Sequence, residues 1–258
     1  MKPVIPVLLI LVAIAAAVSA AWLYLSRSFP SGRGEVVAEQ RALPAFSRIA
    51  IEGFAEVTLV QGKTESVTVE GPSKQLASVR TEVRSGTLTI ANNHSRRWWS
   101  EFLGGGTRPA RVTVTYREIE AINAAGAVKL RADRLKTDRL NVTASGATSL
   151  KMSDLDTKEL SITGSGAIKV EVVGRATSQS IDISGAGNYR AAELASDDVR
   201  VTVSGAGRVV VQAERTLRID LSGAGSVEYI GNPKVTQQIS GAGRVKRRNA
   251  AQAAPALA

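Results

Sequence analysis

The sequence has 258 residues, of which 44% are apolar and only 4% are aromatic, and its net charge is +10. It contains no cysteine and a single histidine, His94, which excludes a disulfide framework, a thiolate metal site and a zinc site built from several histidines. This length is enough for one sizeable domain with appendages. The scarcity of aromatic residues favours a thin aliphatic core.

Residues 1–27 contain an apolar run, Val4 to Leu25, that is long enough to span a bilayer. Val18-Ser19-Ala20 resembles a signal-peptidase site, which favours a cleaved signal peptide, whereas the following Trp22 and Tyr24 are typical of a retained anchor. The first interpretation predicts secretion to the periplasm, and the second predicts an inner-membrane anchor with the remainder facing the periplasm or exterior. A buried core helix is the third alternative. Residues 28–44 form a polar linker.

A Gly-Ala marker recurs through the second half of the chain at a nearly constant interval. A fixed period of about 20 residues is the signature of stacked repeats. Each glycine is predicted to form the bend of one repeat, since it adopts backbone angles that a Cβ disfavours. The marker glycines are Gly126, Gly146, Gly166, Gly185, Gly205, Gly223 and Gly241.

Apolar and polar residues alternate on both sides of each marker. Around Gly205, for example, Val201, Val203 and Val209 alternate with Thr202 and Arg208. Period two indicates two short half-buried strands in each repeat. The predicted fold is therefore all-β: a parallel β-helix or β-solenoid of short rungs with a period of about 18–20 residues, preceded by one N-terminal hydrophobic helix.

The repeat domain is predicted to cover residues 45–248. Weaker repeats precede the markers, with inward positions at Ile49, Ile51, Val57 and Leu59 around Gly53. Further inward positions are expected at Val67 and Val69, and in a unit formed by Leu88, Ile90, Val112 and Val114. This last unit is interrupted by an insertion at 93–110, and a disordered tail of low complexity is expected at 249–258.

The insertion carries Arg96, Arg97, Trp98 and Trp99, the most unusual local feature of the chain. These residues could form a ligand-binding tip, with indoles stacking on sugar rings or resting on a membrane interface. The alternative is a plug that covers an apolar part of the repeats, since large aromatic side chains are usually buried.

Two columns of basic residues are expected to run along the stacked repeats. One contains Lys129, Lys169, Arg208 and Arg244, and the other contains Arg131, Lys151, Arg190 and Lys246. They predict a surface for anionic glycans or lipid headgroups. The alternative is ordinary solubilising charge. Nucleic acid is not an expected partner of an exported domain without a recognition motif.

No coherent catalytic group is found. Gly-Ala-Gly follows a strand but opens no helix, so it is interpreted as a structural corner and not as a dinucleotide cradle. Asp182 and Asp220 share one column two repeats apart, which is too sparse for calcium and only loosely fits an inverting carboxylate pair. No cofactor or metal is expected.

The segment from Val201 to Val209, Val-Thr-Val-Ser-Gly-Ala-Gly-Arg-Val, behind an apolar signal or anchor resembles the bacterial head GIN domain family, which is labelled an auto-transporter adhesin. The similarity covers about residues 45–248. It implies a β-solenoid exported to the envelope, and it implies no catalytic residues.

The sequence thus predicts a non-enzymatic binding or structural module of the cell envelope, with anionic glycans or envelope surfaces as partners. Two alternatives remain: a carbohydrate-active enzyme, a polysaccharide lyase or hydrolase, on the same scaffold, and a purely architectural spacer. The first rests on analogy of fold alone.

Overall fold

The computed structural model describes residues 36–92 and 110–249. Three predicted features lie outside the described residues: the apolar segment at 1–27, residues Arg96 to Trp99 of the insertion, and all but the first residue of the tail predicted at 249–258. In the described ranges, no helix is long and apolar enough to cross a membrane. The elements are β1 (Val36–Ala42), β2 (Arg48–Gln61), β3 (Ser66–Pro72), α2 (Ser73–Leu76), β4 (Val79–Arg84), β5 (Thr87–Asn92), β6 (Arg111–Tyr116), β7 (Ala121–Ala132), β8 (Leu135–Gln212), β9 (Thr216–Gly223), β10 (Ser226–Ile230), β11 (Lys234–Gly241) and β12 (Arg244–Arg247).

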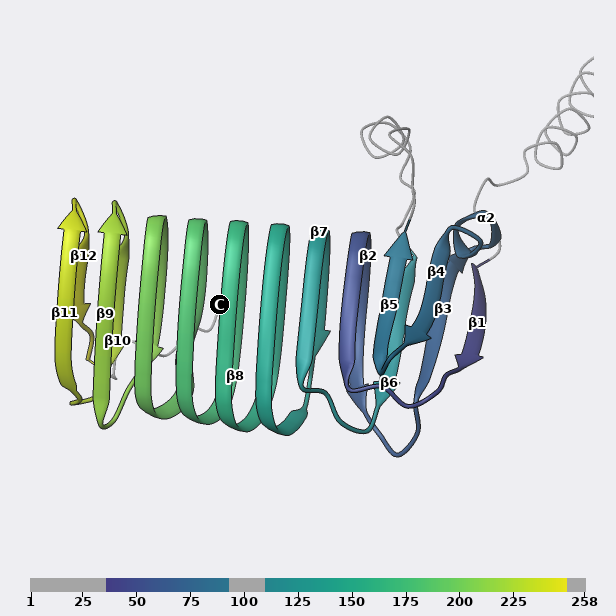
Figure 1. Cartoon of the computed structure of the whole chain (residues 1–258), viewed down its shortest axis with the longest axis horizontal. Helices are drawn as coiled ribbons and strands as arrows, with labels where there is room; N and C mark the ends of the chain where they lie inside the picture. The colour runs from purple at the N-terminus through teal and green to yellow at the C-terminus, as the bar shows by residue number, and fades with distance from the viewer. Residues whose placement is uncertain (1–35, 93–109, 250–258) are drawn as a thin grey trace, which may run out of the picture. The chain divides into compact units, whose positions relative to one another are not determined.

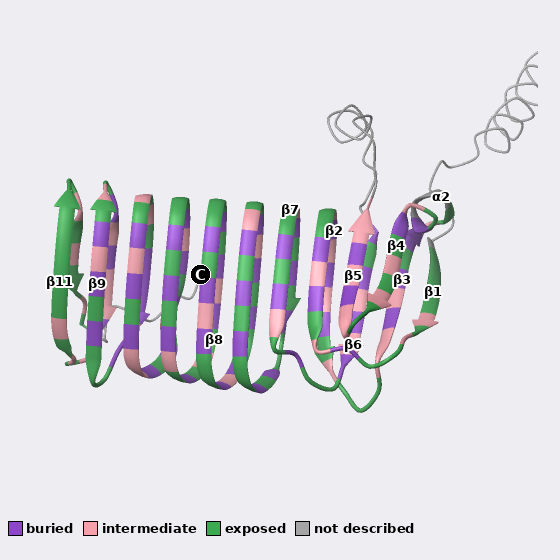
Figure 2. Cartoon of the chain, in the orientation of Figure 1, coloured by how far each residue is buried: buried purple, intermediate pink, exposed green. Residues whose placement is uncertain are grey.

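Residues 121–247 form a stack of parallel turns, each paired with the turn before it (Figure 1). β7 pairs with the start of β8 in a register that places Gly126 beside Gly146. At the other end β11 pairs with β9, which places Gly241 beside Gly223, and β12 pairs with β10. Each marker thus meets the next marker, so one repeat makes one turn. Buried and exposed residues alternate along the turns of β8, whereas β11 and β12 of the last turn contain no buried residue (Figure 2).

The marker glycines lie in a single file that also includes Gly53. A Cβ placed on Gly166 would lie 2.6 Å from the carbonyl oxygen of Gly146, and Gly166 has φ of 101°. Both the positive φ and the close approach exclude a side chain here. The strand ladder nevertheless continues through these positions, because β8 runs unbroken from Leu135 to Gln212. The glycines therefore bend a continuous ladder and do not separate two strands.

Inside this bend, the residues two before and two after the glycine share one space. In the early turns the first is small and the second large, as in Ala124 with Val128. In the later turns the order reverses: Ile183 is large, and a Cβ on Gly187 would lie only 2.4 Å from its Cγ2 atom. The second glycine of Gly-Ala-Gly thus provides room for an aliphatic side chain of the same turn, as close packing requires.

β2 lies between two units that are separated from each other in the sequence. On one side it pairs with β7, where Gly53 meets Gly126; on the other it pairs with β5 and β6, where Gly53 meets Asn92. The predicted inward residues of these units are fully or almost fully buried: Ile49, Ile51, Val57, Leu59, Val67, Val69, Leu88, Ile90, Val112 and Val114.

The all-β class is confirmed, but the predicted parallel β-helix with an N-terminal helix is wrong. The twelve-stranded sheet is mixed, because β3 is antiparallel to β6 and β4 is antiparallel to β5. Within the described residues no N-terminal helix is seen, and the helix found there is the four-residue α2. Order along the sheet also departs from chain order, since β6 precedes β2.

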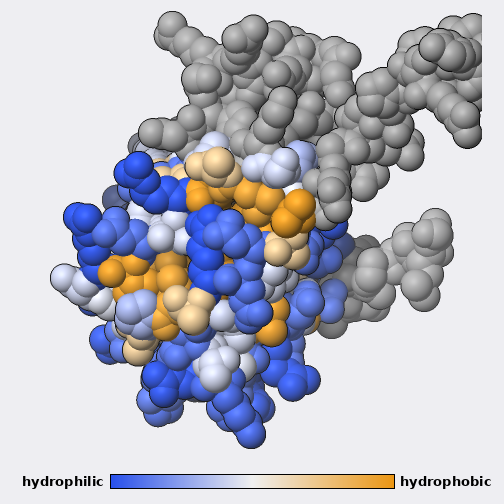
Figure 3. All heavy atoms as spheres, turned by 90° about the vertical axis from the view of Figure 1, so that its right-hand side faces the viewer, coloured by the Kyte–Doolittle hydropathy of each residue, from blue (hydrophilic) through white to orange (hydrophobic). Residues whose placement is uncertain are grey.

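The antiparallel pairing of β4 with β5 follows from their short connection, because parallel neighbours need a longer crossover. β4 and β5 are joined by Ser85 and Gly86, both with positive φ (49° and 73°). This is the backbone of a tight hairpin turn. At this end of the sheet Val37 is 41% exposed, and hydrophobic patches lie beside hydrophilic residues (Figure 3).

We expect Gly166→Ala to lower the free energy of unfolding by about 3 kcal/mol or more, since the added methyl group meets a backbone oxygen and the residue keeps a positive φ. Urea unfolding followed by circular dichroism measures the change. The neighbouring exposed Ala167→Ser should stay within about 0.5 kcal/mol of the parent chain. Equal midpoints for both variants would contradict the close approach.

The shared corner predicts coupling between Ile183 and Gly187. Ile183→Ala should cost about 2–4 kcal/mol through a cavity, and Gly187→Val should be destabilising through overpacking. The double variant copies the Ala124–Val128 pair of an earlier turn, so it should recover about 1–3 kcal/mol of the summed loss. A double-mutant cycle measures this term, and simple additivity would show that the two side chains do not share space.

Candidate functional site

The predicted basic column is not a continuous stripe. Lys129 forms an ion pair with Glu56 (3.5 Å), and Lys169 forms one with Glu171 (3.1 Å). Arg208 is exposed and has no ion-pair partner among the described residues. Exposed ion pairs of this kind contribute little to stability, but they neutralise the cation. Of the four cations predicted in this column, the structure therefore leaves Arg208 and Arg244 without an ion-pair partner among the described residues.

The other column divides in the same way. Arg190 lies 3.8 Å from Glu171, which is thereby shared with Lys169 and offsets one of these two positive charges. Arg131 and Lys151 are paired neighbours without a carboxylate partner in the described part of the chain.

A denser group of cations occupies the last turns, which we call the carboxy-terminal cations. They are exposed and form no ion pair within residues 36–92 and 110–249: Arg208, Arg244, Lys246 and Arg247. Ser226 pairs with Arg208 on one side and with Arg244 on the other, so the two guanidinium groups come from one outward column. At the strand spacing, their Cα atoms are about 9.6 Å apart.

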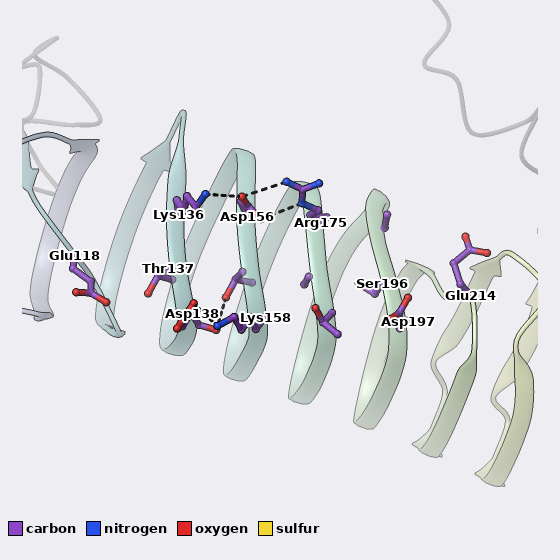
Figure 4. A pocket seen from close by; sticks show the side chains of 14 residues that line it. Glu118, Lys136, Thr137, Asp138, Asp156, Lys158, Arg175, Ser196, Asp197 and Glu214 are labelled. Carbon is purple, nitrogen blue, oxygen red and sulfur yellow. Dashed lines mark hydrogen bonds and ion pairs between the residues drawn. The ribbon is translucent and has the colours of Figure 1, made fainter.

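A separate groove, the turn groove, runs across the polar bends on the far side of each turn from the glycines (Figure 4). It is open, has a volume of about 670 Å³, and is lined by Glu118, Lys136, Thr137, Asp138, Asp156, Thr157, Lys158, Arg175, Ala176, Thr177, Ala195, Ser196, Asp197 and Glu214.

Opposite charges on successive turns pair along this groove. Asp156 lies between Lys136 (3.5 Å) and Arg175 (3.1 Å), and Asp138 lies 3.0 Å from Lys158. Sequence analysis missed this ladder, although the signal was present: the members of each pair are separated in the chain by one repeat period. These ion pairs connect successive bends, and they leave few unpaired charges in the groove that could bind a ligand.

Asp156 of the turn groove is not suited to act as a general acid at neutral pH. The hydrogen bond from Arg175 holds the pKa of Asp156 below its ordinary value, so this carboxyl is ionised at neutral pH. The carboxylate pair considered from the sequence is also unsupported, because Asp220 is bound by Arg200 (3.0 Å) and Arg218 (3.4 Å). Neither Asp182 nor Asp220 lines the turn groove. No group of three or more potential metal ligands occurs among the described residues.

Buried polar side chains beneath the turn groove are satisfied by one another. Tyr189 donates a hydrogen bond to Oε1 of Gln179 (3.0 Å), and Nε2 of Gln179 donates to Oγ of Ser196 (2.7 Å). Burial raises the pKa of Tyr189, which keeps the phenol protonated. The network therefore completes the core of one turn and supplies no reactive group.

The chain belongs to the family described as "putative auto-transporter adhesin, head GIN domain", whose profile matches residues 45–233. Among curated proteins, none matches the sequence.

Crystal structures of similar fold come from Bacteroides fragilis and Parabacteroides distasonis. A "putative adhesin" from Bacteroides fragilis aligns with a TM-score of 0.76 at 20% identity, covering 85% of this chain and 99% of its own. A "putative adhesin" from Parabacteroides distasonis has a TM-score of 0.64 at 21% identity, with 84% and 98% covered. A "putative lipid binding protein" from the same species has a TM-score of 0.66 at 18% identity, with 84% and 98% covered. At these identities the likeness concerns the fold alone.

The ion pairs of the turn groove predict that Arg175→Gln raises the pKa of Asp156 toward its ordinary value of 3.8, because both the hydrogen bond and the positive charge of Arg175 are lost. A carboxyl with a depressed pKa stabilises the fold above its unfolded pKa and loses that contribution as the pH falls. The variant should therefore show a weaker loss of stability between about pH 4 and pH 2. Carboxyl ¹³C titration by NMR measures the pKa directly, and an unchanged value would contradict the ion pair.

Proposed function

We propose that this chain is an exported, non-enzymatic binding module of the cell envelope, and that its carboxy-terminal cations bind anionic polymers or anionic envelope surfaces. The family is described as an adhesin, which supports a binding role over a catalytic one. The apolar segment at 4–25 supports export, with the domain either held at the inner membrane and facing the periplasm or exterior, or released to the periplasm.

The proposal of an anionic ligand rests on one observation: some cations of the surface have carboxylate partners and others do not. Most cations of the middle turns already have a carboxylate partner, as Lys169 does, whereas Arg208, Arg244, Lys246 and Arg247 have none in the described ranges. A cluster of uncompensated cations raises the local concentration of anionic ligands. Outward columns spaced about 4.8 Å per turn present these charges to an extended polymer.

No specific observation on the described residues favours the alternative of a carbohydrate-active enzyme. Asp156 has a lowered pKa, and Asp220 is occupied by two arginines. The residues Arg96 to Trp99 of the insertion, a second candidate for ligand contact, lie outside the described residues.

The proposal predicts that the full chain in a neutral detergent binds polygalacturonate or heparin with an affinity that falls as salt rises. The double variant R208A/R244A should bind about tenfold more weakly, at up to about 1 kcal/mol for each exposed contact. The matched control is K129A/K169A, which removes the same charge from two cations that already have partners, and it should lose less than about threefold. Isothermal titration calorimetry measures the affinities of the parent chain and of the two double variants.

Vesicles containing anionic lipid are the second arm of this experiment and separate a membrane ligand from a soluble polysaccharide. Binding to neither probe, or equal losses in both double variants, would contradict the proposal.

A further inference from the structure

The last turn of the stack ends in two open strand edges. β11 pairs only with β9 and β12 only with β10 among the described residues, so their outer backbone groups have no strand partner there. Ile239 of this turn is 39% exposed, and Val235 and Val245 are half-buried. An unpaired edge of this kind is a template for another strand.

Hydrogen bonds identify which amides of β12 point outward along the stack. Arg244 N–H donates to the carbonyl of Gly225 (3.0 Å), and Arg248 N–H donates to that of Tyr229 (2.8 Å), so both face β10. Alternate residues of a strand direct their amides to opposite sides. Val245 and Arg247 therefore direct their N–H groups away from β10, toward the open edge.

The chemistry of β12 selects its partner. Arg244, Lys246 and Arg247 are exposed and lack ion-pair partners in the described part of the chain, and half-buried Val245 lies between the first two. The one carboxylate on the adjoining strand β10, Glu228, already lies 3.8 Å from Arg248. A second copy placed edge to edge would bring the same cations together, which is repulsive.

We propose that the open edge of β12 binds an acidic, extended polypeptide segment of a partner protein, which adds to the sheet as one more strand. Main-chain hydrogen bonds from Val245 and Arg247 hold its backbone. Its acidic side chains lie opposite Arg244 and Lys246, and an apolar residue between them covers Val245. This interaction differs from the binding of anionic polymers across the outer face, because it requires backbone amides and not charge alone.

The probe is a short peptide of alternating glutamate and valine, capped at both ends and carrying a fluorophore, added to the full chain in a neutral detergent. We expect saturable binding, with amide hydrogen exchange at Val245 and Arg247 slowed at least tenfold. A peptide of the same composition with all glutamates before all valines should bind at least fivefold more weakly, because it cannot alternate along the edge.

Two matched pairs of variants isolate the backbone contribution. R247A and R247P lose the same charge, but only R247P loses the amide that faces the open edge, so it should bind about fivefold more weakly than R247A. Proline is tolerated at such an edge because that amide bonds no other strand of the stack. On β11, Q237A and Q237P should bind equally, since the peptide lies on β12.

Equal binding by R247A and R247P, or equal binding of the two peptides, would overturn strand addition in favour of simple charge attraction. Slow amide hydrogen exchange at Val245 and Arg247 in the absence of peptide would also overturn the proposal, because it would show that the edge is already occupied. If deletion of 250–258 restored fast exchange, the occupant would be the chain's own tail. If size-exclusion chromatography showed a dimer, the occupant would be a second copy. R208A separates the two proposals, because it should weaken binding of the anionic polymer but leave peptide binding unchanged.

Discussion

The structure depends on the close approach of backbone to backbone at the glycine corner. A Cβ on Gly146 or Gly205 would lie 2.6 Å from the carbonyl oxygen of the glycine one turn earlier. Only a residue without a side chain permits this approach with a positive φ. Because each glycine corner contacts the corner one turn earlier, the turns are held in register. Equivalent residues at all other positions of the repeat therefore also lie side by side. The aliphatic core, the cation columns and the ion pairs between turns all follow from it.

Register also explains the distribution of charge. An acidic residue one period after a basic residue lies directly beside it, as Asp156 does beside Lys136. Where the repeats offer such a carboxylate, the cation is neutralised; where they do not, as at Arg244, the charge remains available. The ligand chemistry of the surface is therefore set by which turns carry acidic residues, and net charge alone does not locate it.

Much of the repeat region could be predicted from the sequence, because period-two alternation and a fixed interval are both local signals. The inward residues Ile49, Leu88 and Val112 were identified in this way and are buried. The antiparallel pairing of β3 with β6 and of β4 with β5 could not be predicted by extending the repeat, since β3 and β4 show the same alternation of apolar residues as the parallel strands. Ser85-Gly86 between two alternating segments was the available hairpin signal.

The candidate site was predictable only in part. The sequence placed Lys129, Lys169 and Arg208 in one column. Which of these cations has a carboxylate partner depends on Glu56 and Glu171, and Glu56 is distant from Lys129 along the chain. Long-range pairing of this kind requires the order of the strands, and β2 packs against β7 out of the order that simple repetition implies. The ion ladder of the turn groove, in contrast, could have been found by aligning the repeats.

The most direct test of the stacked register is a set of distances between spin labels, which the absence of native cysteine makes straightforward. Labels at Ser145 and Ser222 are four turns apart, and labels at Ser145 and Ser240 are five turns apart. Pulsed electron paramagnetic resonance should give mean separations of about 19 Å and about 24 Å, rising by one strand spacing of about 4.8 Å. Separations that fail to increase with the number of intervening turns would contradict the single file of glycines.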